Sequence, residues 1–237
     1  MPEGVEGSES FRLKTNHEVQ ILPENDRAID VLRSIESGYQ RRHLVTGSLG
    51  AEGVVGREFR SVHDIDMCIP RQDAAVTIDF FAQLGFTQLP PEQARHLHGN
   101  GAILKRPDGF SVDVWFGDFS EQGLTLRSPD GELFIPREGL DYAANLRGVE
   151  FKTLSPEVHY FLKNRAISRH PLRTISPVNR SQDVTDYKEL KKVVDPIKAK
   201  YLLSHGFAYR GRHPLPRIIK EQIGDKIKKV LNPRRNS

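Results

Sequence analysis

The stretch "VTGSLGAEGVVGREFRSVHDIDMCIP", residues 45–70, places a Gly-Ser pair 16 residues ahead of an Asp-Ile-Asp. The segment "DIDMCIP", residues 64–70, has apolar residues at every second position, which predicts a β-strand. Side chains two residues apart on a strand project to the same face. Asp64 and Asp66 are therefore expected to lie side by side, on the face opposite the apolar side chains.

Two carboxylates held side by side repel each other unless a cation lies between them. Mg²⁺ prefers such hard oxygen ligands and keeps coordination positions for phosphate oxygens. A third carboxylate, Asp113 in "SVDVWF", is expected on a neighbouring strand. Three carboxylates on adjacent strands can hold two metal ions roughly 4 Å apart and clamp a phosphoryl or nucleotidyl transfer. An isolated Asp-x-Asp is otherwise an ordinary surface feature.

Gly47 and Ser48 complete this pattern at the other end of the stretch. A glycine turn at the end of a strand lets backbone amides approach phosphate oxygens, and a serine hydroxyl adds another donor. The residue types and their order therefore indicate a phosphate-binding turn beside a metal-binding strand.

The chain resembles the DNA polymerase beta-type nucleotidyltransferase superfamily. The resemblance rests on Gly47-Ser48, the run Arg60-x-x-His63-Asp64-Ile65-Asp66, and Val112-Asp113-Val114. The small nucleotidyltransferases that modify aminoglycosides and lincosamides are the most similar group. The resemblance extends through "GVEFKTLSPEVHYFLKNRA" and "RSQDVTDYKEL" and covers roughly residues 25–195.

The resemblance implies a role for each acidic residue. Asp64 and Asp66 would be metal ligands. Asp113 would be the third acid, either a further metal ligand or the general base for the acceptor hydroxyl.

The resemblance also implies a nucleotide-binding set. Gly47 and Ser48 would contact the phosphates, and Arg60 and Lys163 are cations able to neutralise the triphosphate. A structural ion pair remains the alternative for Arg60, and an ordinary exposed helix lysine remains the alternative for Lys163.

The segment "LGAEGVVG", residues 49–56, departs from the family pattern because it holds three glycines. Glycine costs about 1 kcal/mol in a helix interior. The helix expected there is therefore predicted to be short or distorted.

The predicted fold class is α+β, with a nucleotidyltransferase-type mixed sheet, flanking helices and a C-terminal helical domain. Residues 20–148 form the expected catalytic domain and residues 149–237 the expected helical domain. The sequence predicts helices from Pro23 to Gly38, over residues 71–86 with Val76, Phe80 and Leu84 inward, and in four segments beyond residue 154. It predicts strands at residues 42–48, 64–70 and 87–116, and loops over 117–147.

The composition limits the class of protein further. Net charge is +4, apolar residues make up 37%, and no apolar run is long enough to span a membrane. The single cysteine, Cys68, excludes an internal disulfide and an all-cysteine zinc site, and favours a cytoplasmic location. Residues 205–237 contain nine Lys and Arg against two acidic residues. Such a basic segment fits either a solvated helix face or a polyanionic partner such as RNA.

Other residues favour structural roles. His63 precedes the acid pair and is expected to be structural, with a phosphate contact as the alternative. His96 and His98 alternate without a third ligand nearby, and Trp115 and Phe116 are expected to pack in the core. Asp183 and Asp186 are interpreted as a helix cap and a surface pair.

The sequence therefore predicts a nucleotidyltransferase that uses two Mg²⁺ ions and a nucleoside triphosphate, with ATP the donor expected by family habit. The expected acceptor is a hydroxyl of a small molecule such as an aminoglycoside or lincosamide. Two alternatives remain open: a toxin-type enzyme that modifies a protein or transfer RNA, and a nucleotide-binding module without catalysis. The oligomeric state is not predicted.

Overall fold

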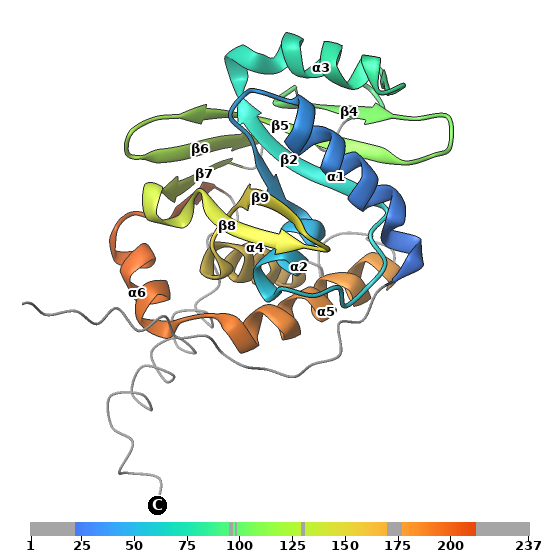
Figure 1. Cartoon of the computed structure of the whole chain (residues 1–237). Helices are drawn as coiled ribbons and strands as arrows, with labels where there is room; N and C mark the ends of the chain where they lie inside the picture. Colours follow the sequence, from blue (N-terminus) through green and yellow to red (C-terminus); the bar gives the residue numbers. More distant parts are fainter. Residues whose placement is uncertain (1–21, 95–96, 98, 129–130, 170–176, 212–237) are drawn as a thin grey trace, which may run out of the picture.

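The computed structural model describes residues 22–94, 97, 99–128, 131–169 and 177–211 (Figure 1). The helices are α1 (Asp26–Gly38), α2 (Gly47–Val55), α3 (Ala74–Gln83), α4 (Pro156–Arg169), α5 (Pro177–Val193) and α6 (Pro196–Ser204), with 3₁₀ turns η1 (Pro23–Asn25), η2 (Arg71–Asp73) and η4 (Arg137–Gly139). The strands are β1 (Leu44–Thr46), β2 (Asp64–Pro70), β3 (Thr87–Gln88), β4 (Gly101–Lys105), β5 (Ser111–Phe119), β6 (Gly123–Ser128), β7 (Gly131–Pro136), β8 (Tyr142–Leu146), β9 (Val149–Thr153) and β10 (Ala208–Gly211).

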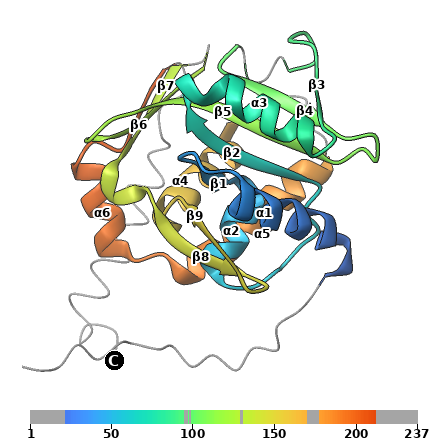
Figure 2. The same cartoon turned by 45° about the horizontal axis from the view of Figure 1, so that its top comes forward.

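The strands form one mixed sheet in the order β10-β7-β6-β5-β2-β1-β9-β8. β2 and β5 run parallel, as do β1 and β9, whereas β1 and β2 are antiparallel. β5 pairs with β2 over residues 111–117, with β4 over residues 111–115 and with β6 at Asp118 and Phe119, and β3 pairs in turn with β4. In Figure 1, α3 lies at the top beyond β4 and β5, whereas α2, α4 and α5 lie together in the lower half; Figure 2 keeps α3 over the same strands.

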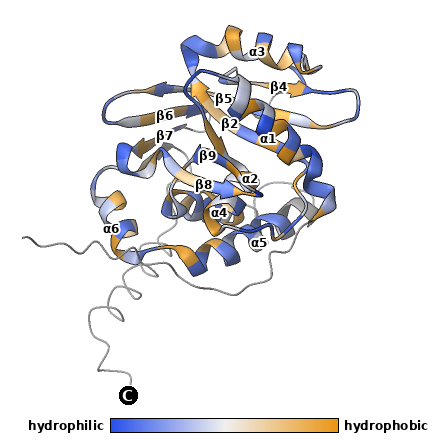
Figure 3. Cartoon of the chain, in the orientation of Figure 1, coloured by the Kyte–Doolittle hydropathy of each residue, from blue (hydrophilic) through white to orange (hydrophobic). Residues whose placement is uncertain are grey.

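The alternation of β2 places side chains in two different cores. Ile65 and Met67 belong to the core that contains residues of α1 and α3. Cys68 belongs to the second core, which contains residues of α4, α5 and α6. Because Asp64 and Asp66 have the same parity as Cys68, they lie on the face that looks toward the C-terminal helices. Figure 3 shows the two-sided character of the outer helices, where hydrophobic and hydrophilic bands alternate along α1 and α3.

The mixed sheet with flanking helices confirms the predicted fold class. β2 coincides with the predicted segment 64–70, and α1 ends at the predicted Gly38. The helices predicted after residue 154 are present as α4, α5 and α6, except the last, which lies outside the described residues. The division at residue 148 falls in the turn between β8 and β9. The assignment of two domains stays a prediction.

Three expectations about local structure are wrong. The segment 117–147, predicted as loops, contains β6, β7 and β8, because its Asp-Gly and Pro positions connect short strands. The segment after 149 is not all helical, since β9 pairs with β1 and β8, and β10 pairs with β7. Val76, predicted to point inward, is 44% exposed, whereas Phe80 and Leu84 do pack against the first core; the fully buried positions of α3 are Thr77 and Phe81. Thr77 is buried because its hydroxyl meets that of Tyr39 at 2.6 Å.

The helix α2 is continuous over nine residues, so of the two expected outcomes it is short and is not interrupted by its glycines. Its glycines allow close packing. A Cβ on Gly50 would lie 2.7 Å from both the His159 ring and the Thr153 hydroxyl, and one on Gly53 would overlap the ring of Phe151. Gly56 closes the helix in the left-handed conformation, with φ of 78°. Gly50 and Gly53 therefore let α2 lie directly against α4 and the β8–β9 hairpin.

No helix among the described residues is long and apolar enough to cross a membrane. His96, His98, residues 1–10 and most of the basic segment 205–237 lie outside the described residues. The predictions made for them stay predictions.

Candidate active site

The strand register brings the Gly-Ser turn and the acidic residues to one end of the sheet. Thr46 lies opposite Asp66 in the antiparallel β1–β2 pair, so Gly47 and Ser48 follow directly beside that aspartate. Asp66 in turn lies opposite Asp113 in the parallel β2–β5 pair. The backbone alone thus assembles three parts of the predicted site from segments that are about twenty to sixty residues apart.

Gly47 has no space for a side chain. Its φ of +60° lies in the left-handed region, and a Cβ at this position would overlap the Asp66 carboxylate. The Asp66 side chain therefore lies against the turn where α2 begins. Thr46, the residue that caps α2, makes no side-chain capping hydrogen bond. Helix N-termini favour anions, and this end of α2 is capped by no hydrogen bond from the Thr46 side chain.

The pKa of Asp64 reflects the burial of its carboxyl and the presence of a second acidic residue nearby. Its pKa is raised, first by burial and then by the neighbouring charge of Asp113, whereas Arg60 and Lys163 lower it. Asp64 and Asp113 are therefore close enough to repel each other. Among the described residues, however, no three His, Cys, Asp or Glu side chains are gathered in the arrangement of a metal site. The strand register nevertheless aligns Asp66 with Asp113 on adjacent strands.

The predicted nucleotide-binding residues meet around a residue that the sequence analysis placed on the surface. The Asp186 side chain on α5 is fully buried, and its Oδ2 accepts hydrogen bonds from Ser48 Oγ at 2.8 Å and from Lys163 Nζ at 2.6 Å. Arg60 Nε donates to Oδ1 at 2.7 Å, and the same guanidinium contacts the Ser48 hydroxyl. Ser48, Arg60 and Lys163 thus come together from α2, the loop before β2, and α4. Ser48, Arg60, Lys163 and Asp186, together with Asp183, are called the Asp186 cluster below.

The interpretation of Asp186 as a surface residue is therefore wrong. One pattern could have revealed it: Asp186 and Leu190 are four residues apart on α5, and both are fully buried. A charged residue on the apolar face of a helix is expected to be paired. The Lys163 side chain is 14% exposed and pairs with Asp183 at 3.0 Å as well as with Asp186, so it is not an ordinary exposed lysine. Arg60 does make the ion pair that was the alternative for it.

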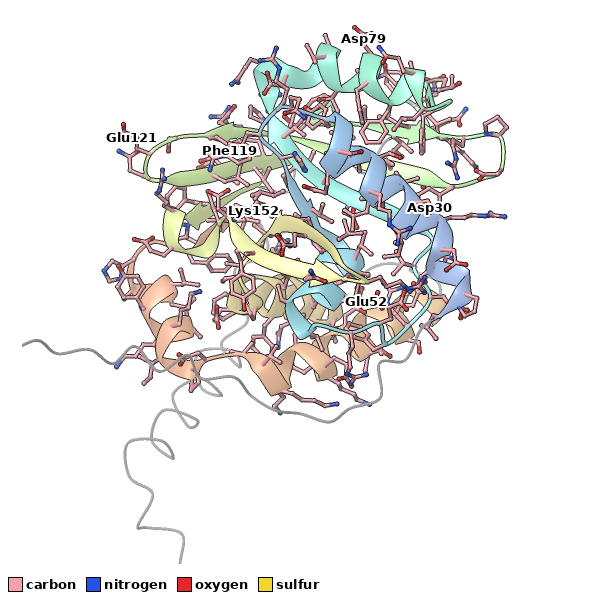
Figure 4. The ribbon with its side chains drawn as sticks, viewed as in Figure 1. Asp30, Glu52, Asp79, Phe119, Glu121 and Lys152 are labelled. Carbon is pink, nitrogen blue, oxygen red and sulfur yellow. The ribbon has the colours of Figure 1, made fainter. Side chains whose placement is uncertain are left out.

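Glu52 supports the loop that carries Arg60. This carboxyl on α2 is fully buried, and its Oε1 accepts the backbone N–H groups of Phe59 and Arg60 at 3.0 and 3.1 Å. Figure 4 labels Glu52 in the lower half of the molecule, whereas Asp79 lies at its top on α3. Burial raises the pKa of Glu52 to about 7, with Glu58 adding a smaller repulsion. The sequence offered no pattern that singled out Glu52.

Of the remaining candidates, Trp115 and Phe116 have structural surroundings, whereas His63 does not. His63 is exposed, Trp115 packs against the second core and Phe116 against the first. His159, which the sequence analysis passed over, is buried beneath α2, with Nε2 at 2.8 Å from the Thr153 hydroxyl. Burial lowers the pKa of His159 to about 3, helped by the charge of Lys163, so this imidazole is neutral. It serves packing between α4 and β9.

Comparison with known proteins gives structural matches only. No model of a protein family matches the chain, and no curated protein is significantly similar to it. The lincomycin-bound lincosamide antibiotic adenylyltransferase LnuA aligns over 72% of this chain and 96% of its own, with 16% identity and a TM-score of 0.51. The antibiotic-resistance factor ANT(2'')-Ia, in complex with adenylyl-2''-tobramycin, aligns over 75% and 94%, with 13% identity and a TM-score of 0.57.

The chain has the nucleotidyltransferase fold. A second structure of ANT(2'')-Ia, determined in solution, matches 86% of this chain with 11% identity and a TM-score of 0.56. At such identities the likeness extends to the fold alone. Within the nucleotidyltransferase fold of this chain, the acid-bearing strands β2 and β5 lie side by side, with the turn at Gly47 and Ser48 next to β2.

Proposed function

We propose that the protein is a metal-dependent nucleotidyltransferase that moves a nucleoside monophosphate, with ATP as the expected donor, to a hydroxyl of a small acceptor molecule. The observation that carries the proposal is the register: Gly47, Asp66 and Asp113 are neighbours at one end of the sheet. Asp64 lies on the same face, and its pKa is raised by burial and by Asp113.

The acids fit a divalent cation in donor type and charge. Asp64, Asp66 and Asp113 would hold Mg²⁺, since carboxylate oxygens are its preferred protein ligands. A bound cation would relieve the electrostatic repulsion between the Asp64 and Asp113 carboxylates. When bound, the metal supplies charge neutralisation and alignment of the transferring phosphoryl group. Asp113 would serve either as a ligand or as the base that accepts the acceptor's hydroxyl proton.

The chain's own donors would position the triphosphate. The first amides of α2 and the flanking glycine allow close approach of phosphate oxygens. Arg60 and Lys163 place two positive charges within reach of Ser48, next to those amides. Donors fixed in this way stabilise charge that develops during transfer without reorganising.

The acceptor class rests on analogy of fold. LnuA was solved with lincomycin and ANT(2'')-Ia with an adenylylated tobramycin, so hydroxylated antibiotics are the first acceptors to test. The basic segment 205–237 supports a second class, transfer RNA, because polyanions attract Lys and Arg clusters.

A mass-resolved transfer assay tests the proposal. The protein is incubated with Mg²⁺ and each of the four nucleoside triphosphates, against pooled aminoglycosides and lincosamides, total transfer RNA, and the protein itself. The double variant Asp64→Asn, Asp66→Asn is the blank. A nucleotide-sized mass gain on a small acceptor, absent in the blank, supports the proposal. Gain on transfer RNA or protein assigns the toxin-type alternative, and no gain and no triphosphate binding by the folded protein contradicts any nucleotide role.

A further inference from the structure

Asp186 is the common partner of the three candidate phosphate-binding side chains. Its two oxygens receive Arg60 Nε, the Ser48 hydroxyl and Lys163 Nζ at 2.6–2.8 Å. The three donors belong to segments separated by as many as 115 residues. No two of them are adjacent in the sequence, so their meeting point is defined by this carboxylate.

The Asp186 carboxylate remains ionised although it is buried. Burial alone would raise its pKa, but Lys163 and Arg60 together lower it below its usual value. Lys163 responds in the opposite direction: its pKa is raised by Asp186 and Asp183 against the effect of burial. Asp186 and Lys163 are thus both charged near neutral pH, and each depends on the other for its counter-charge.

Asp186 also fixes the direction of the Ser48 hydroxyl. Because that hydroxyl donates its proton to Asp186 Oδ2, its oxygen is left to accept from Arg60, with Lys163 Nζ at 3.4 Å. Asp183 is the more exposed of the two acids. It pairs with Lys163 at 3.0 Å from a side chain that is 22% exposed, against 0% for Asp186.

We propose that Asp186 is a positioning residue, which holds Ser48, Arg60 and Lys163 in one arrangement at the start of α2 so that they receive the triphosphate together. It makes no contact with the nucleotide itself. This inference rests on the proposed function and extends it to α5, a helix that carries none of the predicted metal ligands. Asp183 serves as the matched control, since it lies one turn away on the same helix and shares Lys163.

The first experiment compares Asp186→Asn with Asp183→Asn. The amide keeps the shape of the carboxylate and removes its charge. The Kd for Mg²⁺-ATP, measured by calorimetry, is expected to rise about tenfold or more in Asp186→Asn, and by less than about threefold in Asp183→Asn. In the transfer assay KM is expected to rise more than kcat falls. Equal effects of the two substitutions on folded protein would overturn the proposal.

A double-mutant cycle separates positioning from general destabilisation. If Asp186 acts through Ser48, the loss of ATP affinity in Ser48→Ala combined with Asp186→Asn is expected to be clearly smaller than the two single losses added together. Additive losses would mean that Asp186 acts elsewhere, and would contradict the assignment.

A third measurement does not depend on nucleotide binding. Brief treatment with acetic anhydride at pH 8, followed by peptide mass spectrometry, reports how reactive the Lys163 amine is. Slow labelling is expected in the wild type and in Asp183→Asn, and faster labelling in Asp186→Asn. Unchanged labelling would overturn the organising role of Asp186. If Lys163 is labelled faster in Asp186→Asn but the wild-type protein binds no triphosphate, the proposed function is overturned. Asp186 is then only a link within the fold.

Discussion

Asp66 of β2 lies directly opposite Asp113 of β5 in the parallel register of the two strands. Adjacent strands lie about 4.8 Å apart, so residues in this relationship carry their carboxylates from neighbouring backbones on the same face. Val112 and Val114, on either side of Asp113, are buried in the opposite core. Neither acid can therefore be moved to the other face without turning a whole strand over.

Asp66→Asn and Asp113→Asn are each expected to abolish nucleotidyl transfer, with a loss of at least about a hundredfold in kcat. The amide preserves volume, so the fold is expected to persist. Asp79→Asn, at an exposed position on α3, is the control and is expected to leave kcat unchanged. The measurement is the initial rate of transfer together with circular dichroism. Retention of the wild-type rate by either site variant would contradict the assigned roles.

Asp64→Asn is expected to stabilise the metal-free protein at neutral pH. The folded-state pKa of Asp64 is raised above its unfolded value by burial and by Asp113. Its contribution to stability is therefore complete below the unfolded pKa and is lost as pH rises through the folded pKa. Asparagine stays neutral at all pH values, so the variant does not lose stability as pH rises through that pKa.

Thermal unfolding in the presence of EDTA at pH 3.5 and pH 7.5 measures this effect. The difference in Tm between variant and wild type is expected to be larger at pH 7.5. Adding MgCl₂ is expected to raise the Tm of the wild type more than that of the variant. Equal Tm gains with MgCl₂ would argue against Asp64 as a ligand.

Gly47→Ala is expected to reduce both stability and transfer. The left-handed φ costs a residue with a Cβ about 1–2 kcal/mol, and the methyl group would also overlap the Asp66 carboxylate. Gly148→Ala is the matched control, since Gly148 has φ of +77° and open space around it. Urea unfolding of both variants isolates the steric part. If both lose the same stability and both retain transfer, the close approach of Gly47 to Asp66 has no functional role.

The parts of the site that could be predicted from the sequence are those that depend on local patterns. The alternation in residues 64–70 fixes which face Asp64 and Asp66 share, and the Gly-Ser turn precedes a regular helix. The glycines of α2 were interpreted as helix-weakening because propensity considers a helix alone. In the fold, Gly50 and Gly53 allow the ring of His159 and the ring of Phe151 to reach the helix backbone.

The Asp186 cluster could not be predicted in the same way. Asp186 lies 138 residues from Ser48 and 126 from Arg60, and no local pattern links them. The four-residue spacing from Asp186 to Leu190 would have placed the carboxylate on a buried face but not named its partners. The strands β6 and β7 were missed for a different reason: they pair with each other as a hairpin, and the Asp-Gly and Pro signals around their turn were interpreted as loop.

Glu52→Gln is expected to remove a pH dependence of stability between about pH 4.5 and pH 7. The pKa of Glu52 rises from 4.5 to about 7 on folding, chiefly through burial. The folded state thus holds a proton that the unfolded state releases, and stability falls by on the order of 3 kcal/mol as pH rises through this range. Glutamine stays neutral and keeps an oxygen for the amides of Phe59 and Arg60.

The free energy of unfolding is measured in urea at half-unit pH steps. Its dependence on pH is expected to be flatter for Glu52→Gln than for the wild type, whereas Glu121→Gln, at an exposed loop position, should follow the wild type. Parallel curves for Glu52→Gln and the wild type would show that this buried carboxyl titrates normally and that the support of Arg60 does not depend on its protonation.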